Sequence, residues 1–323
     1  MEVKTDARCS QVQQFVFQAT KTPLPVNSFE PRRAPMDVVR PDGIRYVSEI
    51  SYESKYPNGF MDIFYCPEPG LHPTIFNWHG GGFLFGDKAS GDPLATKEDV
   101  EGGLLARLVR EGYNVVTLNY AFAPEYRYPI QLHQVNEALA FCLAHAEELG
   151  LDMERVFLMG GSAGAVFTEI YGLAVVDADY AAKLGFEAAL PEHNLRGLII
   201  NEAPTNYKEF DNEDMYTMFF TWLGVNDLSE CTHAEPLDVP KCIKDRYPPA
   251  CIIASNLEHY FPESAQQLAD ALEAIGGDYV HFYRPESVEK LEHGFINRFA
   301  ASKCAAEAVE MVVQFLRSHT QGN

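Results

Sequence analysis

The first feature with chemical potential is a serine flanked by glycines. The pentapeptide Gly160-Gly161-Ser162-Ala163-Gly164 lies between an apolar run at 155–159 and a helical pattern that starts near residue 164. A tight strand-to-helix turn of the form G-x-S-x-G presents the serine hydroxyl at a helix N-terminus, where negative charge is favoured. This context predicts Ser162 as a nucleophile. The pentapeptide alone also fits a turn used for packing or for phosphate binding.

A run of three glycines is the second feature. His79-Gly80-Gly81-Gly82 directly follows the apolar run 74–78. Consecutive glycines allow backbone N–H groups to point at one negative charge, as in an oxyanion hole. A phosphate loop would need a lysine and a hydroxyl residue after the glycines, whereas Phe83-Leu84-Phe85 follow here. We expect His79 to shape this loop through a hydrogen bond rather than to act as a base.

A base for the serine must come from elsewhere in the chain. Sites of this kind follow the chain order serine, acid, histidine. Among ten histidines, His293 stands in Glu292-His293-Gly294-Phe295, after the last predicted strand and before the terminal helix. We therefore predict that His293 takes the proton of Ser162.

The elements that must position these residues alternate between strands and helices. An alternation of this kind predicts an α/β fold with a mainly parallel sheet covered by helices on both faces. Strands are predicted at 74–78, 114–119, 155–159, 197–201, 250–255 and 279–283, and helices at 101–111, 134–149, 164–176, 262–275 and about 300–319.

Composition and charge exclude several classes of protein. The 323 residues include 25 basic and 46 acidic side chains, so the net charge of −21 disfavours nucleic acid and anionic membranes as partners. No stretch approaches the roughly 18 apolar residues of a spanning helix. Charged residues near the start oppose a signal peptide, so we expect a cytoplasmic protein. Seven cysteines without a C-x-x-C pair indicate neither disulfides nor a zinc site.

Four motifs in one order give the sequence a family resemblance. They are the His79 glycine loop, the segment 119–125 (NYAFAPE, similar to D-Y-R-L-A-P-E), the serine pentapeptide and His293-Gly294-Phe295. Together they resemble the hormone-sensitive-lipase-like branch of the α/β-hydrolases, which are esterases and acyl hydrolases. The resemblance implies an α/β-hydrolase fold and an activity that requires no cofactor or metal. It also implies that the amides of Gly81, Gly82 and Ala163 are the oxyanion donors.

The resemblance also implies a cap over the site. Residues 1–43, with an amphipathic patch at 12–19 and then a proline-rich stretch, are expected to form an N-terminal cap segment, and 44–323 the catalytic domain. A cap insertion is expected at about 205–247, which is aromatic, acidic and helix-like at 215–223. The alternative is that both segments are ordinary surface insertions.

The acid of the triad departs from the family pattern. Where the family has an aspartate in D-P-L-x-D, this chain reads SNLEHYFPE at 255–263. Depending on the alignment, His259 or Glu258 occupies the acid position. Because glutamate also fills this role in the fold, we predict Glu258 as the acid, with Glu263 in reserve.

The expected activity is hydrolysis of short-chain acyl esters, acetyl to butyryl, through an acyl-enzyme, by family analogy. The substrate would be a small-molecule ester, and a homo-oligomer is compatible with the sequence. Two alternatives are an amidase, formamidase or acyltransferase on the same residues, or a non-catalytic ligand-binding homologue. Aromatic residues expected to line an acyl pocket, unless they are simply core, are Phe83, Phe85, Phe219 and Trp222.

Overall fold

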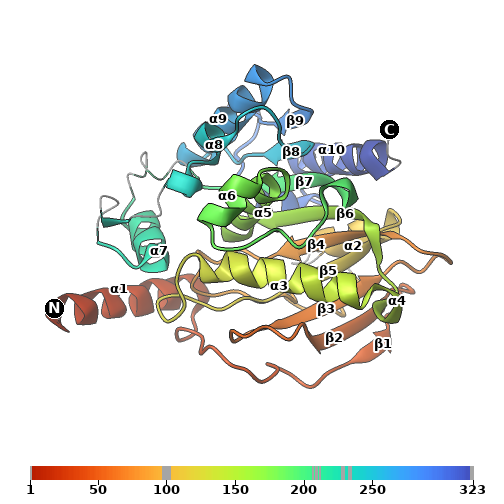
Figure 1. Cartoon of the computed structure of the whole chain (residues 1–323), viewed down its shortest axis with the longest axis horizontal. Helices are drawn as coiled ribbons and strands as arrows, with labels where there is room; N and C mark the ends of the chain where they lie inside the picture. Colours follow the sequence, from red (N-terminus) through yellow and green to blue (C-terminus); the bar gives the residue numbers. More distant parts are fainter. Residues whose placement is uncertain are drawn as a thin grey trace.

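A single nine-stranded sheet forms the centre of the computed structural model (Figure 1). The structure describes residues 2–96, 103–205, 207, 210, 212–226, 230–231 and 235–320, with side chains from residue 10 onward. The strand order is β1-β2-β3-β5-β4-β6-β7-β8-β9. The first strands, up to the β3–β5 pair, run antiparallel, and all pairs from β5 to β9 are parallel. The expectation of an α/β-hydrolase fold with a mainly parallel sheet is confirmed.

The strands begin and end close to the predicted positions. Those foreseen are β4 (Pro73–Trp78), β5 (Asn114–Leu118), β6 (Asp152–Gly161), β7 (Leu195–Asn201), β8 (Ala250–Ile253) and β9 (Tyr279–Phe282). The antiparallel strands were not foreseen: β1 (Asp37–Val39), β2 (Arg45–Ser51) and β3 (Phe60–Tyr65). Since β1 pairs with β2, the sheet begins inside the segment expected to be the N-terminal cap.

Helices cover both faces of the sheet because successive strand residues alternate between two apolar cores. Phe76 and Trp78 of β4 face one core and Ile75 faces the other. The first core packs against α3 (Ile130–Ala144), α5 (Ala163–Val176) and α9 (Tyr260–Ala274), and the second against α2 (Gly103–Arg110) and α10 (Lys303–Thr320). The predicted helix at 134–149 is split into α3 and α4 (Ala146–Leu149), and residues 101–102 of another lie outside the described residues.

Two helices lie beside each other at one end of the molecule, on the left in Figure 1. They are α1 (Glu2–Thr20), which extends well beyond the predicted patch at 12–19, and α7 (Glu213–Leu223), and they contact each other. Val12 and Val16 of α1 and Phe219 and Trp222 of α7 are buried in the same core cluster. Each of the two segments expected to form a cap thus contributes one helix, and these two helices pack together. Shorter helices are α6 (Ala178–Lys183) and α8 (Val239–Cys242).

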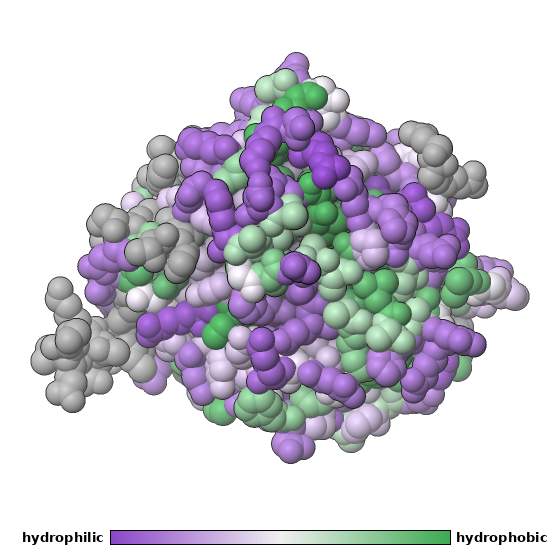
Figure 2. Space-filling view, in the orientation of Figure 1, coloured by the Kyte–Doolittle hydropathy of each residue, from purple (hydrophilic) through white to green (hydrophobic). Residues whose placement is uncertain are grey.

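Figure 2 shows hydrophilic side chains over most of one face, with hydrophobic ones in groups between them. Within the described residues, no helix combines the length and the apolar character that crossing a bilayer requires.

Candidate active site

Ser162 occupies a sharp turn between β6 and α5. Its backbone is at φ 55° and ψ −118°, a conformation that L residues rarely adopt. A Cβ on Gly164 would overlap the backbone carbonyl of Trp78 in β4, so only glycine allows the helix to approach the strand this closely. The Ser162 N–H donates to the carbonyl of Asn201 at the end of β7, 2.9 Å away. The serine is therefore fixed at the carboxyl edge of the sheet between two strands.

The three-glycine loop lies directly against this serine. A Cβ built on Gly80 would stand 3.1 Å from the Cβ of Ser162. Gly81 and Gly82 have φ of 106° and 57°, values that favour glycine. Among the described residues, no hydrogen-bond acceptor is found for the N–H groups of Gly81 and Gly82. Such free amides beside a serine are what an oxyanion hole requires.

His79 fixes the conformation of the three-glycine loop through a hydrogen bond and a ring contact. Its Nδ1 donates to the carbonyl of Gly80 at 2.6 Å, and its ring stacks on Tyr120 with centroids 4.4 Å apart. The Tyr120 hydroxyl donates to the carbonyls of His79 and Gly80. Burial lowers the pKa of His79 to about 4, so its imidazole is neutral at pH 7. This arrangement matches the loop-shaping role expected for His79.

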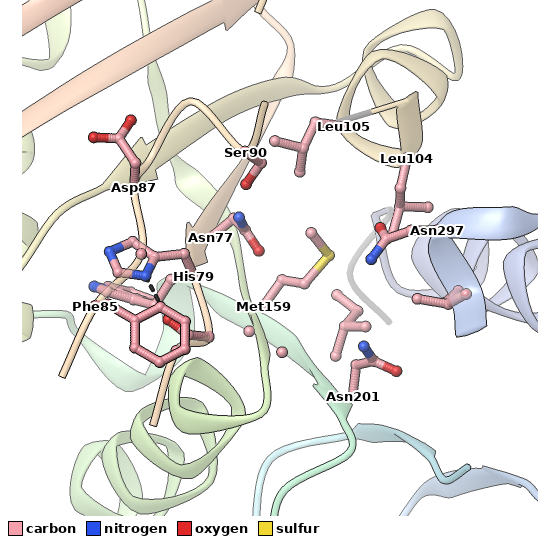
Figure 3. Close-up of a pocket in the computed structure, with 18 of the residues that line it drawn as sticks. Asn77, His79, Phe85, Asp87, Ser90, Leu104, Leu105, Met159, Asn201 and Asn297 are labelled. Atoms are coloured by element: carbon pink, nitrogen blue, oxygen red, sulfur yellow. Dashed lines mark hydrogen bonds between the residues drawn. The ribbon is translucent and has the colours of Figure 1, made fainter. Parts of the chain in front are cut away.

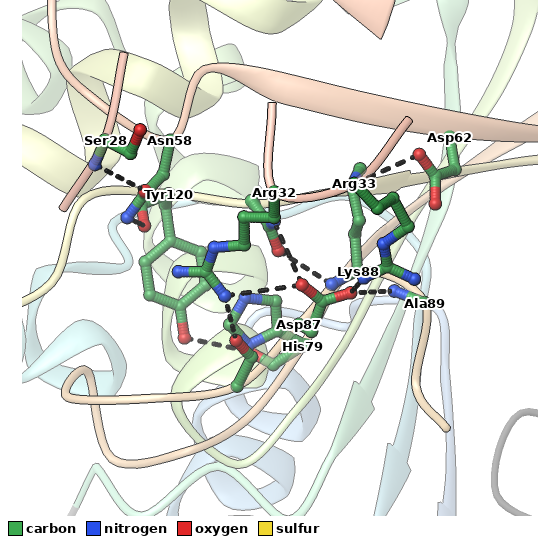
Figure 4. Close-up of polar contacts among 12 residues, drawn as sticks. Ser28, Arg32, Arg33, Asn58, Asp62, His79, Asp87, Lys88, Ala89 and Tyr120 are labelled. Carbon is green, nitrogen blue, oxygen red and sulfur yellow. Dashed lines mark hydrogen bonds and ion pairs between the residues drawn. The ribbon is translucent and has the colours of Figure 1, made fainter. Parts of the chain in front are cut away.

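A buried ionic cluster fixes the chain that follows the loop (Figure 4). Lys88 is completely buried, and its Nζ lies 2.6 Å from Glu49 and 3.3 Å from Asp62. Arg33 bridges Glu49 to Asp87. The backbone N–H of Lys88 donates to Oδ1 of Asn119 at 2.7 Å. Asn119 is the residue that stands where the D-Y-R-L-A-P-E motif has its aspartate. Two cations and three carboxylates thus anchor residues 87 and 88 to β2 and β3.

Asp87 also connects this cluster to the N-terminal segment. Arg32 Nη1 donates to the Gly86 carbonyl at 3.0 Å and lies 3.3 Å from Asp87. Burial raises the pKa of Asp87, but the Ala89 N–H and the cations of Lys88 and Arg33 outweigh this and lower it to about 2. Asp87 is therefore ionised at neutral pH and pairs with both arginines. The N-terminal segment in this way holds the far end of the glycine loop.

The imidazole of His293 lies beside a carboxylate that was not among the predicted site residues. Glu202 immediately follows β7, and its Oε1 is 3.5 Å from Nδ1 of His293. Both of its oxygens accept the N–H of Gly294, at 3.1 and 2.8 Å. The Glu202 side chain is 1% exposed and that of His293 is 40% exposed. The backbone of Ser162 and the loop of His293 are therefore tied to two adjacent residues, Asn201 and Glu202, at the end of β7.

Two glutamates act on the charge of this imidazole. Burial lowers the pKa of His293. The charge and hydrogen bond of Glu202 and the charge of Glu258 raise the pKa by more, so the net shift is upward. Glu258 lies in the loop between β8 and α9, and its Oε2 is buried without a hydrogen-bond partner among the described residues. Glu263, the reserve candidate, is exposed in the first turn of α9. Glu258 therefore remains a predicted participant beside the unforeseen Glu202.

A signal for Glu202 was present in the sequence. Asn201-Glu202 ends a predicted parallel strand next to the one that carries Ser162, and the carboxyl ends of parallel strands share one edge. In the family pattern the acid follows the next strand, at 250–255, and so Glu258 was predicted instead of Glu202.

The family of this chain follows from a comparison with models of protein families. The model of the BD-FAE family matches residues 61–272, which is well over half of the chain. The chain belongs to the BD-FAE family.

Known relatives of this BD-FAE protein share parts of its sequence or its fold. Acetyl esterase from Salmonella paratyphi B is 31% identical over 113 residues, 34% of this chain and 32% of that protein. The chain thus matches about a third of the length of this curated relative. Esterase B from Lactobacillus rhamnosis, solved with a C4-C4 tributyrin phosphonate, has a TM-score of 0.74 at 18% identity, covering 98% of this chain and 96% of its own.

A further structural neighbour is EstE1, a thermophilic carboxylesterase cloned from a metagenomic library. It has a TM-score of 0.63 at 19% identity, and the match covers 98% of this chain and 97% of that one. At these identities, both structural neighbours establish the α/β-hydrolase fold.

The BD-FAE chain has a cavity of about 490 Å³ beside the glycine loop. It is lined by the backbone of Gly80, Gly81, Gly160 and Gly161 and by side chains from the second core. Figure 3 shows Asn77, Met159, Asn201 and Asn297 converging on this space. The cavity therefore borders the glycine loop and the turn that leads into Ser162, although neither Ser162 nor His293 is among its lining residues. It offers both apolar contacts and amide groups.

The four aromatic residues expected in an acyl pocket occupy two environments. Phe85 is half-buried and lines the cavity. Phe83 stacks on Trp222 with ring centroids 3.9 Å apart and meets Phe219 edge to face, and all three side chains are buried. These three residues pack the glycine loop against α7. Their contact with a substrate stays a prediction.

Proposed function

We propose that this protein is a serine carboxylic-ester hydrolase. The observation that carries the proposal is the position of the three-glycine loop against Ser162, with the Gly80 Cβ site 3.1 Å from the serine Cβ. A serine in a strained turn, beside free backbone amides, suits attack on a carbonyl whose oxygen becomes negative. The acetyl esterase relative supports the same assignment.

The proposed mechanism uses residues of the site in two stages. His293 removes the proton of Ser162 while the serine oxygen attacks the ester carbonyl, and the alcohol leaves with that proton. The N–H groups of Gly81, Gly82 and Ala163 would bind the oxyanion in each tetrahedral intermediate. Water, activated by His293, then hydrolyses the acyl-enzyme and releases the acid. A carboxylate on Nδ1 keeps the imidazole oriented throughout.

We assign the substrate to small esters with a short acyl chain, acetyl to butyryl. Phe83, Phe219 and Trp222 pack closely against one another beside the glycine loop, and in this proposal they limit the room for the acyl chain. Support also comes from the acetyl group in the relative's name and from the C4-C4 phosphonate of esterase B. The cavity lined by Asn77 and Asn297 would receive part of the substrate.

The test compares wild type with Ser162→Ala on p-nitrophenyl acetate, butyrate and octanoate. We expect the variant to lose essentially all turnover and the wild type to prefer acetate or butyrate. Equal rates in the two proteins would exclude ester hydrolysis at Ser162. Faster cleavage of matched amides than of esters would favour an amidase, and ligand binding without turnover would favour a non-catalytic homologue.

A further inference from the structure

The imidazole of His293 lies 3.5 Å from Glu202 at the end of one strand, and it stacks on Phe261 in the turn that follows Glu258 at the end of the next. We infer that Glu202 and Glu258 act together as positioning residues for His293, in place of the single acid of a serine-histidine-acid triad. The inference rests on the proposed function, because it concerns the histidine that serves Ser162.

Glu202 holds the histidine loop by both of its oxygens. Each oxygen accepts the Gly294 N–H, and Oε1 is also 3.5 Å from His293 Nδ1. The carboxylate is thus shared between the backbone and the ring. Its distance to Nδ1 is longer than the roughly 2.7 to 2.9 Å of a strong charged hydrogen bond. The Glu202 contact is therefore weaker than a strong charged hydrogen bond, and a second carboxylate can add to the stabilisation of the same imidazole.

Glu258 supplies that second carboxylate from the loop after β8. Its Oε2 is buried and has no hydrogen-bond partner among the described residues. A buried carboxylate oxygen without a partner is costly and calls for a functional explanation. The charge of Glu258 raises the pKa of His293, which is the direction expected of a carboxylate that stabilises a positive imidazole.

The backbone around Glu258 is tied to the same ring. The Glu258 carbonyl accepts the N–H of Phe261 at 3.2 Å, in the first turn of α9. The Phe261 ring stacks on the imidazole of His293 with centroids 4.5 Å apart and planes 2° from parallel. One turn of chain therefore carries both the Glu258 carboxylate and the aromatic ring that lies over the imidazole. Other charged groups on the histidine loop, Glu292 and Arg298, pair with each other in solvent.

Together, the two glutamates divide what one acid does in a triad. Glu202 fixes the position of the histidine loop, and both carboxylates stabilise the imidazolium that forms when Ser162 loses its proton. Removing one should then leave a working, weakened histidine. Removing both should leave the imidazole without a negative partner.

The experiment uses Glu202→Gln, Glu258→Gln, the double variant and the matched control Glu292→Gln, which removes an exposed carboxylate beside His293. The pKa of the His293 ring is measured by NMR titration, and kcat and KM for p-nitrophenyl acetate are measured against pH. We expect each single variant to lower the ring pKa and to lose about 10- to 100-fold in kcat, and the double variant about 10³- to 10⁴-fold. Glu292→Gln should cause a much smaller pKa shift.

A single-acid site gives different results. If Glu258→Gln leaves the ring pKa and kcat at their wild-type values, or if Glu292→Gln shifts the pKa as much as Glu258→Gln does, the inference is overturned. Since Glu258 is partly exposed, this variant decides the question even if Glu202→Gln fails to fold. The NMR titration needs no turnover, so it tests the two carboxylates even if Ser162→Ala shows that the hydrolase proposal is wrong.

Discussion

Gly82 of the three-glycine loop faces Met218 of α7 so closely that a Cβ on the glycine would overlap the methionine sulfur. The glycine loop and α7 therefore pack directly against each other. Gly81 differs, because a Cβ there would overlap the backbone carbonyl of Phe85 within the loop itself. A flexible side chain can move aside at little cost, whereas a backbone carbonyl cannot.

Gly81→Ala should damage the site more than Gly82→Ala. We expect Gly81→Ala to lower kcat by about 10²- to 10³-fold, the loss typical of one oxyanion donor, because the loop must shift away from Ser162. Gly82→Ala should lose less, and adding Met218→Ala should restore part of its activity. The measurements are kcat and KM for p-nitrophenyl acetate, with circular dichroism to check folding. No recovery in the double variant would show that the Met218 contact is not what limits Gly82→Ala.

Ester hydrolysis should depend on a histidine that titrates above its ordinary pKa of 6.5. Partial burial lowers the pKa of His293, but Glu202 and Glu258 raise it by more. Because the base must be neutral, kcat/KM should rise with pH through this raised value and then level off. A pH profile of the wild type measures the midpoint. A midpoint below 6.5 would contradict the upward direction.

Motifs with a fixed local geometry could be predicted from the sequence. The glycines around Ser162 and after His79 specify turns, and the structure places the two turns together because β4 and β6 are neighbours. The strands buried on both faces were also found, since their apolar runs are continuous. The short N-terminal strands escaped notice because β2 and β3 carry polar residues such as Glu49 and Asp62 among their apolar ones.

Contacts between strand ends were harder to predict. Glu202 acts on His293 across about 90 residues of sequence, and no local pattern marks a glutamate after a strand as a partner of one particular histidine. The buried charges gave a similar difficulty. Lys88, Glu49 and Asp62 resemble surface residues in the sequence, and only the fold brings their opposite charges together.

Removing the buried ammonium of Lys88 should strongly destabilise the protein. Lys88→Met leaves Glu49 and Asp62 buried without their closest cation, and breaking a buried pair in this way costs about 3–5 kcal/mol of unfolding free energy. Adding Glu49→Gln should recover part of the loss. Urea denaturation measures the effect. The control Lys290→Met, from an exposed pair with Glu286, should leave the midpoint nearly unchanged, and an equal loss in both variants would refute the cluster's role.

Glu169, on the helix that begins after Ser162, should make stability depend on pH. Burial, and to a smaller extent the charge of Asp238, raise the pKa of Glu169 from 4.5 to about 8, although a hydrogen bond from Thr205 lowers it. Between these values the folded protein holds a proton that the unfolded chain has released. The contribution of Glu169 to stability is therefore complete below pH 4.5 and is lost as the pH rises through about 8.

Glu169→Gln keeps the shape of the side chain and stays neutral at every pH. The melting temperature of this variant should therefore exceed that of the wild type by more at pH 8.5 than at pH 5. The control Glu154→Gln removes an exposed carboxylate and should show no such trend. Thermal denaturation at the two pH values gives the comparison. A constant difference between Glu169→Gln and wild type would mean that Glu169 is already ionised in the folded protein at pH 5.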